Sequence, residues 1–201
     1  MATSLKDVSK ALHGTFGKKP TTAAELPPEL REILESFVSK HPVLDEEDTE
    51  QLQKDLVDIY KKHVSRGAKQ KKEEHAEPSN LERFIHVLKI LRPLTAVGKM
   101  LQEWYKLVIA PVLNAAGHTR MEINLATELT LDILVYNAEG DGSSERAKSS
   151  KYLTNKLLDA YIERTRSKDK DGETNSAEDD FVASQLENVL VAFGQKRPKV
   201  S

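Results

Sequence analysis

The chain has 201 residues, and its 30 Lys and Arg residues against 32 Asp and Glu leave a net charge of −2. With no cysteine it can form no disulfide, thiolate metal site, iron–sulfur cluster or cysteine nucleophile. The near-neutral balance disfavours a dedicated nucleic-acid-binding protein, so we expect no nucleic-acid partner.

The sequence shows no segment that would insert the chain into a membrane. Its first residues lack the apolar core of a secretion signal. The longest apolar run, residues 107–113, contains Pro111 and is far shorter than the ~20 residues that span a bilayer. We therefore expect a cytoplasmic protein, and the length predicts a single domain over residues 1–201.

Apolar residues recur at helical spacing through the first third of the chain. A short amphipathic segment at 5–12 follows Ser4, and a second apolar stripe covers 30–38 with Pro28 in its first turn. A third stripe at 52–64 follows a run of acids and ends with basic residues, which suits both ends of a helix dipole. The spacing predicts three helices.

Two more helices are predicted in the middle of the chain. One covers residues 81–91, where Ser79 and Glu82 have the spacing of a capping box. The other covers residues 101–112, and Pro111 is expected to kink it or divide it in two, because proline lacks the N–H that a helix interior needs.

Residues 121–136 fit two patterns. Four apolar residues alternate as in a strand: Leu129, Leu131, Ile133 and Val135. The segment is nevertheless long and contains no Gly or Pro, which favours a helix. Its apolar residues fall nearly all round the helix, and this predicts a central, buried position.

The last third of the chain predicts two more helices, and three flexible loops are predicted along the chain. The helices carry apolar stripes at 152–162 and 181–193, and Gly194 is the expected end of the second. The loops are polar and rich in Gly, Ser and charged residues, and they lie near 65–78, 138–146 and 167–177.

A short pattern occurs twice, as L-x-x-x-L-V-D-x-Y at 52–60 and as L-x-x-x-L-L-D-x-Y at 153–161. Together with seven to eight predicted helices, it favours an all-α, HEAT- or armadillo-like stack of helical repeats. The alternative is a single irregular helical bundle.

No catalytic or metal-binding constellation stands out. The six histidines lie on different segments, and no phosphate-binding loop, dinucleotide fingerprint or nucleophile elbow occurs. Residues 169–180 resemble a calcium loop, but the glycine stands at the wrong position and the final bidentate Glu is missing. We therefore expect no enzyme activity, no metal and no cofactor.

The strongest electrostatic feature is a basic cluster with no acid between residues 61 and 72. Near an anionic lipid leaflet each such residue could contribute about 1 kcal/mol of binding free energy. The alternative is the favourable basic end of a helix that leads into a solvated loop. The candidate lipid-binding residues are Lys61, Lys62, Arg66, Lys69, Lys71 and Lys72. Smaller basic groups lie at Arg146, Lys148 and Lys151, at Arg164 and Arg166, and at Lys196, Arg197 and Lys199.

From about Phe84 onward, five segments resemble the N-terminal region of fungal members of the hamartin family, subunits of the tuberous sclerosis complex. They are L-R-P at 91–93, L-Q-E-W-Y at 101–105, A-P-V-L at 110–113, L-D-I-L-V-Y at 131–136 and L-E-N-V-L-V-A-F-G-Q-K-R-P-K at 186–199. The first 80 residues resemble the family only in the order and spacing of their elements.

The resemblance implies a HEAT-like N-terminal domain of a long scaffold protein in target-of-rapamycin signalling. That scaffold partners with tuberin, which carries GTPase-activating activity toward Rheb, and it acts at lysosomal or vacuolar membranes that contain phosphoinositides. Tuberin is bound through a coiled coil, and this chain shows no sustained heptads.

Two hypotheses of function follow. The first is a non-catalytic domain that holds a Rheb GTPase-activating complex at an anionic, phosphoinositide-containing membrane as a peripheral protein. The second is a helical-repeat adaptor that binds a segment of a partner protein or a second copy of itself. Steep salt dependence of vesicle binding would favour the first hypothesis, and binding through apolar surface that survives salt would favour the second.

Overall fold

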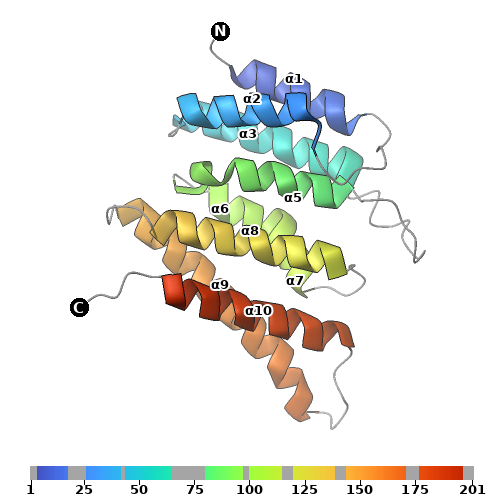
Figure 1. Ribbon diagram of the computed structural model, residues 1–201, viewed down its shortest axis with the longest axis vertical. Coiled ribbons are helices and arrows are strands. Elements are labelled where there is room, and N and C mark those ends of the chain that lie inside the picture. The colour runs from blue at the N-terminus through green and yellow to red at the C-terminus, as the bar shows by residue number, and fades with distance from the viewer. Residues whose placement is uncertain are drawn as a thin grey trace. The chain divides into compact units, whose positions relative to one another are not determined.

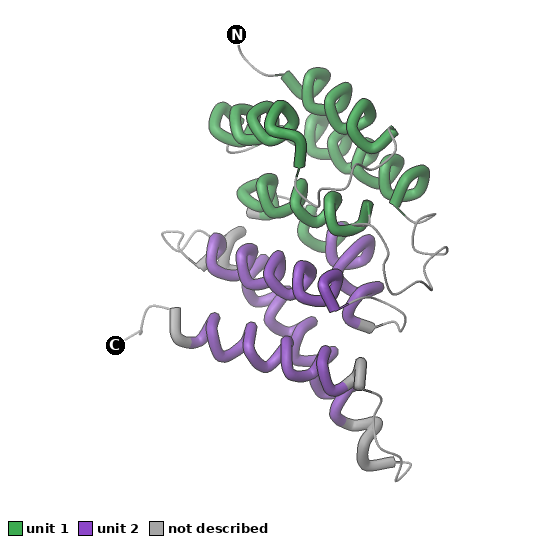
Figure 2. Tube along the Cα trace, turned by 45° about the vertical axis from the view of Figure 1, so that its right-hand side comes forward, with its two compact units in different colours: residues 1–103 green, residues 104–201 purple. Residues whose placement is uncertain are grey.

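The computed structural model describes residues 4–17, 26–41, 44–64, 80–96, 100–114, 120–138, 144–170 and 177–196. Every regular element in these ranges is helical, and none is a strand, so the all-α prediction is confirmed for them. The chain divides into two compact units, residues 1–103 and 104–201 (Figure 2). The single domain over 1–201 stays a prediction.

Unit 1 is built from four α-helices and two short turns among its described residues (Figure 1). They are α1 (Leu5–Phe16), α2 (Pro28–Lys40), α3 (Glu46–Ile59), the π-helical turn η1 (Tyr60–Val64), α5 (Asn80–Ile90) and the 3-10 turn η2 (Arg92–Ala96). Helix α1 packs against α2 and α3, whereas α5 packs against α2 and η1. The helices predicted at 5–12, 30–38, 52–64 and 81–91 are all present.

Side-chain caps fix where two of these helices begin. The Ser4 hydroxyl accepts from the Asp7 N–H, while the Asp7 carboxylate accepts from the Ser4 N–H at 2.9 Å, which forms a capping box at α1. At α3 the Asp45 carboxylate accepts from the Asp48 N–H at 2.8 Å. Each cap satisfies a backbone N–H that has no partner inside its helix.

The Ser4 cap should make the stability of α1 depend on pH. Hydrogen bonds from the Ser4 N–H and hydroxyl lower the pKa of the Asp7 carboxyl below its ordinary value of 3.8. A lowered folded-state pKa stabilises the fold above the unfolded pKa, and this stabilisation is lost as the pH falls through the lowered value. We therefore expect Asp7→Asn to reduce the free energy of unfolding at pH 7 and to have little effect in strong acid. Urea unfolding at both pH values checks this, and an equal effect at both would contradict it.

The core of unit 1 is formed by the apolar stripes that the spacing predicted. Phe84 on α5 is fully buried, and its ring centroid lies 6.1 Å from that of Phe16 and 5.8 Å from that of Tyr60. This aromatic cluster joins α1, η1 and α5. The other apolar side chains of unit 1 with no exposed surface are Val8, Leu34, Leu52, Leu56, Ile59, Ile85, Val87, Leu88 and Leu91.

Helix α6 (Met100–Trp104) contains the boundary between the units, because its first four residues belong to unit 1 and Trp104 to unit 2. The π-helical turn η3 (Tyr105–Ile109) and helix α7 (Ala110–Asn114) follow it directly. The Ala110 N–H donates to the Tyr105 carbonyl five residues back, which widens the turn immediately before Pro111. The helix expected at 101–112 is therefore divided, and the irregular turn precedes the proline.

Unit 2 continues with α8 (Arg120–Ala138), α9 (Ser144–Lys170) and α10 (Ala177–Lys196), and each of these helices contacts the other two. Residues 121–136 are helical and not a strand. Leu129 and Ile133 have no exposed surface, as their central position predicted. Met121 is an exception, because 55% of it is exposed on the first turn.

Three predicted helix ends were wrong. Helix α9 begins at Ser144 and ends at Lys170, so it takes residues from the loops expected at 138–146 and 167–177. Helix α10 begins at Ala177 and does not stop at Gly194, since it continues to Lys196. Glycine and short polar residues lower helix propensity by only about 1 kcal/mol or less per residue, so they do not by themselves end a helix.

Some sequence predictions lie outside the described residues. These are the loop at 65–78, the capping residue Ser79, residues 139–143 and 171–176 of the two later loops, and the basic residues Arg197 and Lys199. Within the described ranges, none of the helices combines the length and the apolar character that crossing a lipid bilayer requires.

Candidate functional site

Two residues of the predicted basic cluster have a described position. Lys61 and Lys62 lie in η1, directly after α3, and both are exposed. The other four candidates, Arg66, Lys69, Lys71 and Lys72, lie outside the described residues. The structure therefore brings two of the six candidates together, on consecutive positions of one turn.

Lys62 also forms an ion pair with a residue in the last turn of α3. Its Nζ lies 3.0 Å from Asp58 Oδ2, four residues earlier, and about half of each side chain is exposed, 59% for the lysine and 48% for the aspartate. Pairs of this kind contribute about 0.3–0.5 kcal/mol, because water screens both charges. The ion pair orients the Lys62 side chain and partly offsets its charge.

The η1 turn is fixed to the rest of unit 1. Val64 is buried, and the Tyr60 ring contacts Phe84 of α5. The Asn80 side-chain amide donates to the carbonyl of His63 at 3.1 Å, which satisfies a carbonyl at the end of the helix. Lys61 and Lys62 therefore extend from a backbone that packing holds in place.

Charge is distributed unevenly along α3 and η1. Helix α3 carries six acidic residues and a single basic one, Lys54, whereas η1 carries Lys61 and Lys62 and no acid. This arrangement complements the helix dipole, with negative charge toward its N-terminus and positive charge at its C-terminus. The acids of α3 are Glu46, Glu47, Asp48, Glu50, Asp55 and Asp58.

The smaller basic groups have different surroundings in the structure. Lys148 and Lys151 are exposed on α9. Arg164, on the same helix, is partly buried, and its Nε donates to the Leu113 carbonyl at 2.9 Å while its Nη2 donates to the same oxygen. Arg164 thus satisfies a backbone carbonyl of α7, so it has a structural role and is not a free member of a basic patch.

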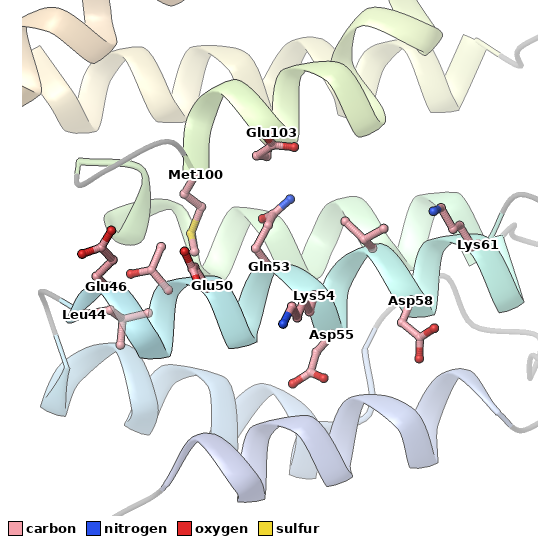
Figure 3. Close-up of a pocket in the computed structure, with 12 residues that line it drawn as sticks. Leu44, Glu46, Glu50, Gln53, Lys54, Asp55, Asp58, Lys61, Met100 and Glu103 are labelled. Carbon is pink, nitrogen blue, oxygen red and sulfur yellow. The ribbon is translucent and has the colours of Figure 1, made fainter.

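The sequence analysis missed a groove on unit 1 with a volume of about 1080 Å³ (Figure 3). Its walls come from α3 and the first turn of α6, together with Leu44, and we call it the α3–α6 groove. The charged residues that line it are the carboxylates Glu46, Glu50, Asp55, Asp58 and Glu103 and the cations Lys54 and Lys61. It is therefore acidic, with three more negative than positive charges.

Figure 3 shows how the two walls approach each other. Met100 extends from α6 toward Glu50, and Gln53 points from α3 toward Glu103 on α6. The Gln53 carboxamide nitrogen and oxygen are both buried and have no hydrogen-bond partner among the described residues. The sequence contains one indication of the α3 wall. The spacing i, i+4, i+7 and i+11 places four lining residues on one face of a helix: Glu46, Glu50, Gln53 and Val57.

The acidic residues of the described ranges do not gather as a metal site, because these ranges contain no group of three potential ligands with suitable geometry. Comparisons of the chain with protein-family models, with curated proteins and with solved structures found no match.

Proposed function

We propose that this chain is a non-catalytic helical domain that binds an anionic, phosphoinositide-containing membrane through its basic cluster. The observation that carries the proposal is the exposed pair Lys61 and Lys62, which η1 holds at the point where the acid-free stretch begins. Two fixed cations lose less entropy on binding than cations on a free chain. Each contributes about 1 kcal/mol near an anionic leaflet.

The charges of α3 restrict how such binding can occur. If α3 lay flat on an anionic surface, its acids would be repelled, because six of its residues are acidic. Contact through the η1 end avoids this repulsion and brings Lys61 and Lys62 to the lipid. Charges more than ~8 Å from the headgroups would contribute little at physiological salt.

The resemblance to hamartin N-terminal regions supplies the wider part of the proposal. We propose a domain of a scaffold that holds a Rheb GTPase-activating complex at the lysosomal or vacuolar membrane, with tuberin bound through other regions. The HEAT- or armadillo-like stack belongs to this proposal. It is supported by the repeated pattern, whose paired leucines are all fully buried: Leu52 and Leu56 in one copy and Leu153 and Leu157 in the other.

Neutralising the charges of Lys61 and Lys62 tests the proposal. We expect Lys61→Gln with Lys62→Gln to weaken binding to phosphatidylcholine vesicles containing a phosphoinositide by about 30-fold, because two contributions of about 1 kcal/mol are lost. Asp58→Asn should strengthen the same binding, since it removes the acid that pairs with Lys62. Vesicle sedimentation at low and physiological salt measures both effects.

The matched control is Lys10→Gln with Lys54→Gln, which removes the same charge from two exposed lysines of unit 1. It should change binding little. An equal loss in the control pair would mean that net charge, and not the η1 end, attracts the membrane. Absence of wild-type binding at low salt would reject the membrane proposal and favour the adaptor hypothesis.

A further inference from the structure

We propose that the α3–α6 groove is a docking site for a basic, amphipathic helical segment of a partner protein. This function differs from membrane binding, and Lys61 is the one residue of the described basic pair that also lines the groove. Glu50 on α3 and Glu103 on α6 are its main charged contacts.

The dimensions of the groove suit a helix better than a small molecule. Its volume of about 1080 Å³ lies just above the range of roughly 300–1,000 Å³ for small-molecule pockets. The wall residues from Glu46 to Val57 span about 16 Å along α3, at roughly 1.5 Å per residue. This distance corresponds to about three helical turns of an incoming segment.

The lining combines apolar surface with negatively charged side chains. Carbon atoms form most of the lining surface, and Leu44, Val57 and Met100 contribute to it. The side chains of Glu46, Glu50 and Glu103 have neither an ion pair nor a hydrogen bond with any described residue. An amphipathic helix with lysine or arginine beside its apolar face would complement both properties, which is how helices bind in grooves.

Gln53 provides an independent indication of a ligand. Its two polar carboxamide atoms are buried at the groove wall without a partner, although a carboxamide can donate twice and accept twice. Buried polar groups are normally hydrogen-bonded. Figure 3 shows this side chain pointing from α3 toward Glu103 on the opposite wall, so the polar atoms of a segment bound between the walls would pair with it.

Other classes of ligand fit less well. Anionic headgroups and nucleic acids would be repelled by the five carboxylates. A metal ion lacks a suitable set of ligands within the described part of the chain. A small polycation would satisfy the charges but leave the apolar surface uncovered, so the experiment must separate it from a helix.

The test uses a fluorescein-labelled amphipathic peptide of about 16 residues, with leucine on one face and lysine on the other, which forms about four helical turns. We expect Glu50→Lys with Glu103→Lys to weaken its binding, measured by fluorescence anisotropy, about 10- to 30-fold, because two attractions become repulsions. Val57→Trp should also weaken binding without a change of charge, since it fills the groove. Far-UV circular dichroism verifies that each variant is folded.

The matched control is Glu32→Lys with Glu35→Lys, which makes the same change of charge on the exposed face of α2. An equal loss in this control would overturn the proposal. So would equal binding of a peptide with the same composition in scrambled order, or complete displacement by spermine, because both would indicate simple polycation binding. Failure of wild-type protein to bind the peptide would also overturn it.

The outcome of the peptide-binding experiment does not depend on the membrane proposal. Glu50→Lys with Glu103→Lys should leave vesicle binding unchanged or stronger, because it removes negative charge from unit 1. Lys61→Gln with Lys62→Gln should leave peptide binding unchanged or stronger, because Lys61 is one of two cations in the groove. Each pair of variants therefore tests one surface.

Discussion

Replacing Phe84 with alanine is expected to destabilise unit 1 by about 3–5 kcal/mol. The ring has no exposed surface and contacts the rings of Phe16 and Tyr60, so its removal leaves a cavity among α1, η1 and α5. This loss would be a large fraction of the 5–15 kcal/mol by which domains of this kind are ordinarily stable. Urea unfolding monitored by far-UV circular dichroism measures it.

Two further variants make the Phe84 result specific. Phe84→Leu retains much of the apolar volume and should cost less than the alanine variant. Lys54→Ala changes an exposed side chain of the same unit and should remain within about ±0.5 kcal/mol of wild type. A cost for Phe84→Ala similar to that of Lys54→Ala would show that this aromatic cluster is not the core of unit 1.

The second large effect is expected in unit 2. Leu129→Ala or Ile133→Ala should each lower the free energy of unfolding by about 2–5 kcal/mol, because each truncation leaves a cavity. Both residues have no exposed surface, and their helix α8 contacts α7, α9 and α10. Few neighbouring groups can relax into a space enclosed by three helices, so the cavity remains.

Matched controls for α8 lie on α9. Leu158 is 41% exposed and Ile162 is 48% exposed, so alanine substitutions there remove the same side chains from a partly hydrated position. They should cost much less than Leu129→Ala and Ile133→Ala, since less apolar surface returns to water. Costs below about 1 kcal/mol for both α8 variants would mean that α8 is peripheral.

These experiments and the binding tests address different properties. The core variants measure how much the buried side chains contribute to the free energy of unfolding of each unit. The variants at Lys61 and Lys62, and those at Glu50 and Glu103, change exposed or half-buried charges and should leave stability nearly unchanged. A binding defect without a stability defect can therefore be assigned to the surface that was changed.

The sequence by itself predicted which segments are helical, because the 3.6-residue period of buried side chains is a local property. It also predicted a buried position for the helix at 121–136, and Leu129 and Ile133 in that helix have no exposed surface. It did not predict the full length of α9, because residues 144–146 and 167–170 have the polar composition that is typical of loops, although they form helical turns.

The candidate sites likewise have some features that the sequence predicts and others that only the tertiary structure shows. The charge of Lys61 and Lys62 is visible in the sequence, and so is the spacing that pairs Lys62 with Asp58. The α3–α6 groove is not, because it requires Met100 and Glu103 to lie against a helix about 50 residues earlier in the chain. Likewise, only the tertiary structure brings Arg164 to the Leu113 carbonyl, 51 residues away, and so makes it a structural residue. Helical period and charge are local, whereas grooves and distant caps depend on which helices pack together.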